Sequence, residues 1–156
     1  MYPAIDRGKR NLLAIGTALL AGVTACSRAS ASASPDDIEQ PARASDEAFI
    51  ERAFEMRKRA LQLGDQGYGA VLVRDGLIVA QSPSRVVTAN DPSAHAEMET
   101  IRQAARNLGS RDLSGCTLYS STAACPMCEA AAYWAGIERQ VAGRGMTDGG
   151  RPRLCG

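Results

Sequence analysis

The sequence predicts an α/β fold in which helices cover a mixed β-sheet. Segments with helical spacing alternate with short apolar strands between residues 46 and 142, in the order α-β-β-α-β-α-β. Asp75-Gly76, placed between two apolar runs, indicates a tight hairpin turn, so the first two strands are expected to pair. Of the 156 residues, 45% are hydrophobic, which is enough to form the core of one domain.

The first helix is expected at residues 46–63 and the hairpin strands at residues 68–73 and 77–80. Ser45 or Asp46 can cap the helix, and Gly64 ends it. The apolar stripe of this helix is Phe49, Ala53, Met56, Ala60 and Leu63.

The second half of the domain supplies two further helices and two further strands. Gly109 is a stop signal for the second helix, and Pro126 suits the first turn of the third, where a missing N–H does no harm. The expected elements are a loop at 83–92, a helix from Ser93 or Ala94 to Asn107, a strand at 116–121, a helix at 126–135 and a strand at 139–142.

The first 26 residues have the pattern of a secretory signal peptide. A start with three basic residues precedes an apolar run at residues 12–23, which is shorter than the roughly 20 residues of a spanning helix. Val23-Thr24-Ala25-Cys26 resembles the bacterial lipobox, whose cysteine is lipidated after cleavage. We therefore expect an exported periplasmic or cell-envelope lipoprotein that meets the membrane only through a lipid anchor on Cys26.

Two other interpretations fit the same leader, namely a plain cleaved signal with an incidental cysteine and a short membrane anchor. Residues 27–45 are rich in Ser, Ala, Pro and Asp and lack an apolar period, which predicts a flexible linker. The folded domain is therefore expected at residues 46–144, and residues 145–156 are expected to form an irregular tail.

Charge does not favour a nucleic-acid partner. The chain has 18 basic and 17 acidic side chains and a net charge of +1, whereas nucleic-acid-binding domains usually carry a clear basic excess. The near-equal numbers of basic and acidic side chains favour a small-molecule ligand over a nucleic acid.

Two short motifs carry metal chemistry, His95-Ala96-Glu97 and Cys125-Pro126-Met127-Cys128. Each follows a predicted loop and opens a predicted helix. Two cysteines at positions i and i+3 lie on one side of a helical turn, where the positive helix N-terminus favours thiolates. With His95 as a third ligand, one position of a tetrahedral Zn²⁺ stays open for water, as in catalytic zinc sites.

Glu97 is the candidate catalytic base. On a regular helix His95 and Glu97 face nearly opposite ways, so they converge only at the helix end. Glu97 would then lie beside the water without being a ligand, and its carboxylate could accept a proton from that water.

These motifs resemble the His-x-Glu and Pro-Cys-x-x-Cys signature of the cytidine/deoxycytidylate deaminase superfamily. The run from Asn90 to Glu97 is similar to guanine deaminases and tRNA adenosine deaminases. Leu118-Tyr119-Ser120-Ser121 and Tyr133-Trp134-Ala135 are similar to the guanine deaminase branch. The resemblance covers residues 46–144.

The resemblance implies a three-layer α/β/α sandwich, often as a homodimer, with zinc on His95, Cys125 and Cys128 and with Glu97 as the proton shuttle. It implies hydrolytic deamination of a nucleobase or nucleoside, with guanine as the leading candidate. Backbone groups around Ala94 and Ala96 are expected to line the base pocket, and Ser84 matches an asparagine that contacts the base in many relatives. Trp134 fits a pocket wall and a plain core position equally well.

The chain departs from the family pattern at three places. Ala123-Ala124 replaces the usual Glu-Pro before the first cysteine, and Ser84 replaces the base-contacting asparagine. The Gly- and Arg-rich tail at 145–156 leaves the last strand and the lid of the pocket missing or much reduced.

Three alternatives therefore stay open. The cysteine pair would also suit a thiol-disulfide exchange protein, although such a protein has no need of His95 and Glu97. A non-catalytic zinc-binding protein of the same family would tolerate the three departures from the family pattern. A deaminase that acts on nucleic acid is the third alternative, and the net charge of only +1 argues against it.

Overall fold

The predicted order of elements is found between residues 46 and 150, with one strand more than expected. The computed structural model describes residues 38–154, so the predicted signal peptide, Cys26 and most of the predicted linker lie outside the described residues. The elements are α1 (Asp46–Gln62), β1 (Gly69–Arg74), β2 (Leu77–Pro83), α2 (Ala96–Leu108), β3 (Cys116–Ser120), α3 (Pro126–Trp134), β4 (Arg139–Ala142) and β5 (Thr147–Gly150).

The five strands form one mixed sheet in the order β2-β1-β3-β4-β5. β1 pairs antiparallel with both β2 and β3, because the Asp75-Gly76 turn reverses the chain directly after β1. β3 and β4 are parallel, since α3 carries the chain back between them, and β5 is antiparallel to β4. The prediction of a mixed sheet is confirmed.

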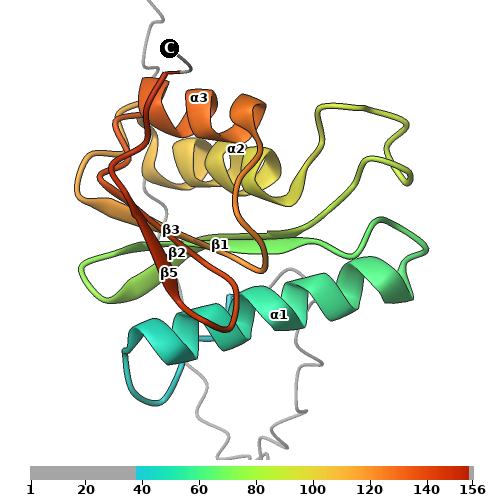
Figure 1. Cartoon of the computed structure of the whole chain (residues 1–156), viewed down its shortest axis with the longest axis horizontal. Helices are drawn as coiled ribbons and strands as arrows, with labels where there is room; N and C mark the ends of the chain where they lie inside the picture. The colour runs from blue at the N-terminus through green and yellow to red at the C-terminus, as the bar shows by residue number, and fades with distance from the viewer. Residues whose placement is uncertain (1–37, 155–156) are drawn as a thin grey trace, which may run out of the picture. The chain divides into compact units, whose positions relative to one another are not determined.

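The helices lie on both faces of this sheet, so the three-layer α/β/α sandwich is confirmed. α1 covers one face, and α2 and α3 lie together on the other (Figure 1). β1 is central and buried almost throughout, and its side chains alternate between two cores. Ala70 and Leu72 pack on the α2 and α3 side, whereas Val71 and Val73 pack toward α1.

The helix ends follow the capping signals closely. The Ala48 N–H donates to the Ser45 hydroxyl at 3.2 Å at the start of α1, and Gly64 takes a positive φ of 76° just beyond its end. Gly109, with a φ of 61°, caps α2 in the left-handed conformation. α2 begins two or three residues later than predicted, which leaves His95 in extended backbone immediately before the helix.

The tail differs from the prediction, because Thr147–Gly150 form β5 instead of irregular structure. All four residues of β5 are exposed and none is a large apolar residue, so the sequence shows no burial pattern for this strand. The strand is held by its ladder with β4 and by an ion pair from Arg139 Nε to Asp148 at 2.8 Å. The last strand of the sheet is therefore present.

Gly69, at the start of β1, sets how closely α1 approaches the sheet. A methyl group at this position would overlap the backbone of α1 at the Ala53 carbonyl and the Arg57 amide. Gly69→Ala is expected to lower the free energy of unfolding by about 2–4 kcal/mol, because backbone cannot move aside as a side chain can.

The measurement is a urea titration of Gly69→Ala beside Gly145→Ala, whose added methyl group would meet no atom within 4 Å. Equal midpoints for the two variants would show that α1 does not depend on this close approach.

Candidate metal centre

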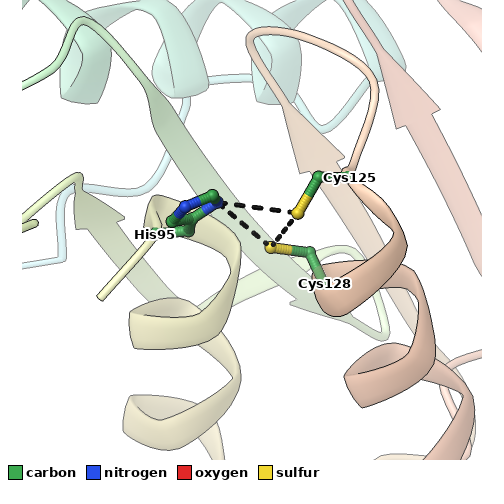
Figure 2. Close-up of side chains that lie close together, drawn as sticks. All are labelled: His95, Cys125 and Cys128. Atoms are coloured by element: carbon green, nitrogen blue, oxygen red, sulfur yellow. Dashed lines mark hydrogen bonds between the residues drawn. The ribbon is translucent and has the colours of Figure 1, made fainter. Parts of the chain in front are cut away.

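The N-termini of α2 and α3 meet on one face of the sheet. His95 is the N-cap residue of α2, with φ −61° and ψ 153°, and Cys125 is the N-cap residue of α3, with φ −73° and ψ 165°. Neither side chain caps its own helix. The extended backbone at both positions turns these side chains across the gap between the helices, where the imidazole faces both cysteine sulfurs (Figure 2).

His95, Cys125 and Cys128 form a compact triangle of ligand atoms. Each sulfur lies 3.7 Å from His95 Nδ1, and the two sulfurs are 3.6 Å apart. A tetrahedral zinc ion with Zn–S bonds of about 2.3 Å and Zn–N bonds of about 2.0 Å separates two sulfurs by about 3.8 Å and a sulfur from a nitrogen by about 3.6 Å. The three side chains therefore fit one zinc ion with only small movements.

The protein environment makes a bare thiolate at Cys128 costly. Burial raises the pKa of the Cys128 thiol, and the Glu97 carboxylate and Cys125 raise it further. A bound cation reverses this balance, since zinc binds the thiolate and displaces its proton. The positive N-termini of α2 and α3 add to the stabilisation of negative charge at this point.

Glu97 lies beside the triangle. Its carboxyl group is buried, with 5% of the residue exposed, and Oε2 is 3.7 Å from Cys128 Sγ. Burial raises the pKa of Glu97 and outweighs the opposing effects of its own backbone N–H, of His95 and of Cys128. A carboxyl group with a raised pKa can both accept and return a proton near neutral pH.

A cavity of about 350 Å³ opens onto this group. It lies at the lower end of the range of about 300–1,000 Å³ that is usual for small-molecule sites. Its walls are Gln66, Tyr68, His95, Glu97, Thr122, Ala123 and Cys125.

A family model, the zinc-binding region of cytidine and deoxycytidylate deaminases, matches residues 43–144. The chain belongs to this deaminase family. The family match and the His95, Cys125 and Cys128 group together confirm zinc as the cofactor.

The chain is similar to several individual deaminases. It is 46% identical to the guanine deaminase of Bacillus subtilis over 90 residues, which are 57% of this chain and 58% of that protein. It is 37% identical to a tRNA-specific adenosine deaminase of Aquifex aeolicus over 61% of this chain and 63% of that protein. The crystal structure of the Bacillus subtilis guanine deaminase superposes with a TM-score of 0.60 at 41% identity, covering 63% of this chain and 62% of that one. The chain thus spans less than two thirds of the length of these relatives.

The predicted export as a periplasmic or cell-envelope lipoprotein is wrong. The relatives are deaminases of the cell interior, as the tRNA substrate named for many of them requires. The predicted lipid anchor on Cys26 gains no support from them. Among residues 38–154, no helix is long and apolar enough to cross a membrane.

Two predicted substrate-binding residues do not reach the cavity. Trp134 is 75% exposed at the end of α3, where it packs edge-on against Tyr133, so neither a pocket wall nor a core position describes it. Ser84 is fully buried, and its hydroxyl donates to Asp65 Oδ1 at 2.9 Å. This hydrogen bond directs the Ser84 hydroxyl proton to Asp65, and contact of Ser84 with a base stays a prediction.

Ala94 and Ala96 flank His95 and are buried, and their side chains are not among the cavity walls. The Ala94 carbonyl accepts the Arg85 N–H at 2.9 Å, which closes the base of the loop between β2 and α2. The predicted role of their backbone in base binding stays a prediction.

Sequence reasoning missed Gln66, Tyr68 and Thr122 as cavity walls. The pairing of β1 with β3 brings the residues before β1 beside those after β3, and Ser121 and Gly69 join these segments by two hydrogen bonds. The sequence predicts the hairpin of the first two strands but not the antiparallel pairing of β1 with β3, which places the start of one strand beside the end of the other.

Asp65 is the polar centre that holds the loop in front of the metal group. Its carboxylate accepts hydrogen bonds from five donors, while only 6% of the residue is exposed. The donors are the Ser84 hydroxyl, the Thr88 hydroxyl and the backbone N–H groups of Gln66, Val87 and Thr88, at 2.8–3.0 Å. One carboxylate therefore connects the Gln66–Tyr68 wall with the loop that leads to His95.

Asp65 should make stability depend on pH in the acid range. Burial raises the pKa of Asp65, but the hydrogen bonds from Thr88, Ser84 and Gln66 outweigh it and lower the pKa to about 2. Because the folded pKa lies below the unfolded value of about 3.9, the stabilisation is complete above about pH 4 and is lost as pH falls toward 2. Asp65→Asn is expected to cost about 2–3 kcal/mol at pH 7, and this difference from the wild type should shrink between pH 4 and pH 2.

Urea titrations at pH 7, 4 and 2.5 measure this effect. Ser84→Ala is the matched control, because it removes one of the five donors and should cost only about 1 kcal/mol. A constant difference between the wild type and Asp65→Asn across this pH range would contradict the assignment of the low pKa.

Proposed function

We propose that the protein is a zinc-dependent hydrolytic deaminase of a nucleobase or nucleoside. The observation that carries this proposal is the placement of buried Glu97 beside three zinc-type ligands at the floor of a cavity. The relatives that act by name on guanine and on adenosine in tRNA support the same chemistry.

His95, Cys125 and Cys128 would hold the zinc ion and leave one coordination position open toward the cavity. When bound, zinc supplies the Lewis acidity that makes water a nucleophile near neutral pH. Two thiolates and a neutral imidazole would balance the charge of the ion, so the loaded site adds no net charge to the buried region.

Glu97 would move the protons of the reaction. Its carboxylate accepts a proton from the attacking water and delivers it to a ring nitrogen of the base. It then takes the remaining proton of the added hydroxyl group and donates it to the amine. The amine leaves as ammonia while the ring carbon becomes a carbonyl. The overall balance is one water consumed and one ammonia released, with no change of oxidation state.

Gln66, Tyr68 and Thr122 are the polar cavity walls available to recognise the base. An amide group both donates and accepts hydrogen bonds, which matches the donor–acceptor edge of a purine or pyrimidine. Gln66 is also anchored, because its backbone N–H donates to Asp65 at 2.8 Å. Guanine is the substrate that we favour, on the similarity to the Bacillus subtilis guanine deaminase.

Two alternative functions fit the site less well. A thiol-disulfide exchange protein has no use for an imidazole at 3.7 Å from both sulfurs or for a carboxylate that raises the pKa of Cys128. A zinc-binding relative without activity would not need a buried carboxyl group beside the zinc ligands, since burial of such a group costs stability.

The full-length chain is expected to bind one zinc ion through the three proposed ligands. His95→Ala and Cys128→Ser should lose that ion, because two protein ligands hold zinc poorly. Atomic absorption after dialysis measures the zinc content. Cys116→Ala is the matched control, since Cys116 is also a buried free thiol but lies outside the ligand group, and its zinc content should be unchanged. Loss of zinc in all three variants would point to unfolding and not to loss of a ligand.

Glu97→Gln should retain zinc and lower the rate of ammonia release by about 10²–10⁴-fold, because it removes the proton carrier. Guanine, adenine, cytosine and their nucleosides are offered to the zinc-loaded chain, and ammonia is measured. Glu99→Gln, two residues along the same helix in an ion pair with Arg102, should remain active. No ammonia from any of these compounds by zinc-loaded wild type would overturn the proposal of a small-molecule deaminase.

A further inference from the structure

A second cavity, of about 320 Å³, lies on the β2 side of the sheet. It is bounded by the end of α1, one side of α2 from Glu99 to Arg106, the end of β2 and the loop that follows. It shares no lining residue with the cavity at the metal centre. No part of the proposed deaminase chemistry uses it.

Three arginines from separate segments line this cavity. Arg59 lies in the last turn of α1, Arg85 in the loop after β2 and Arg106 in the last turn of α2. Within the part of the chain that the structure describes, none of the three side chains has an ion pair or a hydrogen-bond acceptor. The arginines that form ion pairs are not among the lining residues, namely Arg52, Arg102, Arg139 and Arg144.

The remaining polar walls do not cancel this charge. Glu99 is the only acidic side chain among the lining residues, and it is bound to Arg102 at 2.6 Å. Gln103 accepts the backbone N–H of Gln81 through Oε1 at 2.7 Å, so its amide NH₂ remains as a donor. The cavity therefore presents donors and about three uncompensated positive charges, in a chain whose net charge is only +1.

Helix dipoles alone do not explain this arrangement. The negative C-termini of α1 and α2 favour a basic residue in each last turn, which accounts for Arg59 and Arg106 taken singly. Arg85 lies in a loop, and its side chain brings a third like charge to the same cavity. Like charges that share a cavity repel one another, and a bound anion relieves that repulsion.

We propose that this cavity binds the phosphate group of a small ligand, such as inorganic phosphate or a nucleotide. Guanidinium groups donate paired hydrogen bonds that match phosphate oxygens, and three of them surround a space of suitable size. A long nucleic acid is disfavoured, because the chain carries 18 basic against 17 acidic side chains and a net charge of only +1.

The site is joined to the loop in front of the metal centre. Thr88 lines the phosphate cavity and donates its hydroxyl to Asp65, and the Arg85 N–H donates to the Ala94 carbonyl beside His95. Phosphate binding is thus expected to hold the same loop that Asp65 holds.

The test is calorimetric titration of the full-length chain with inorganic phosphate, with guanosine monophosphate and with guanosine. We expect one phosphate per chain, an affinity that falls as NaCl is raised, and at least a tenfold weaker affinity in the Arg85→Gln/Arg106→Gln double variant. The charge-matched control is Arg111→Gln/Arg153→Gln, two exposed arginines outside the cavity, which should bind phosphate as the wild type does.

Binding should persist in His95→Ala, so a failure of the zinc chemistry would not affect this result. Tighter binding of guanosine monophosphate than of phosphate, with guanosine alone unaffected by the double variant, would support a nucleotide as the ligand. No saturable binding, or equal loss in both double variants, would overturn the proposal. Binding of a single-stranded oligonucleotide through these arginines without binding of phosphate or nucleotide would overturn it in favour of nucleic acid.

Discussion

The meeting of two helix N-termini on one face of the sheet is the constraint on which the rest of the site depends. α2 and α3 can deliver His95 and Cys125 to the same point because β2 and β3, the strands that precede them, both run antiparallel to β1 and end at the same edge of the sheet. Extended backbone at both N-cap positions then directs the side chains toward each other instead of back along their own helices. Zinc geometry follows from this arrangement, and so does the position of Glu97 in the first turn of α2.

The metal centre was predictable from the sequence because its information is local. The spacing of Cys125 and Cys128 is fixed by one helical turn, and His95 and Glu97 lie within one motif. The helices and the first four strands were also predicted, since capping residues and apolar periods mark them. β5 was not predicted, because it is held by backbone pairing and by the Arg139–Asp148 ion pair and buries nothing. Ser84 was predicted in the substrate site because it matches an asparagine that contacts the base in many relatives. Its hydrogen bond with Asp65, 19 residues away, is a contact that local patterns do not show.

The charges of the domain divide into two kinds. At the metal centre, the buried Cys128 thiol and Glu97 carboxyl group lie close together, so their negative forms repel each other. A bound zinc ion would offset that repulsion. At the β2 side, positive groups surround an open cavity, and no described acidic residue neutralises them. Asp65 connects the two regions, because its carboxylate binds Ser84 and Thr88 of the loop that runs from the second cavity toward His95.

The bond between Ser84 and Asp65 also restricts which side chains position 84 can accept. An asparagine at this position would need more room than a fully buried serine has, and its amide would have to reach Asp65 from a longer side chain. Ser84→Asn is therefore expected to disturb the loop unless position 65 is exchanged as well. Because the two side chains are in direct contact, exchanges at positions 65 and 84 are expected to have non-additive effects, so the order in which they occur would matter.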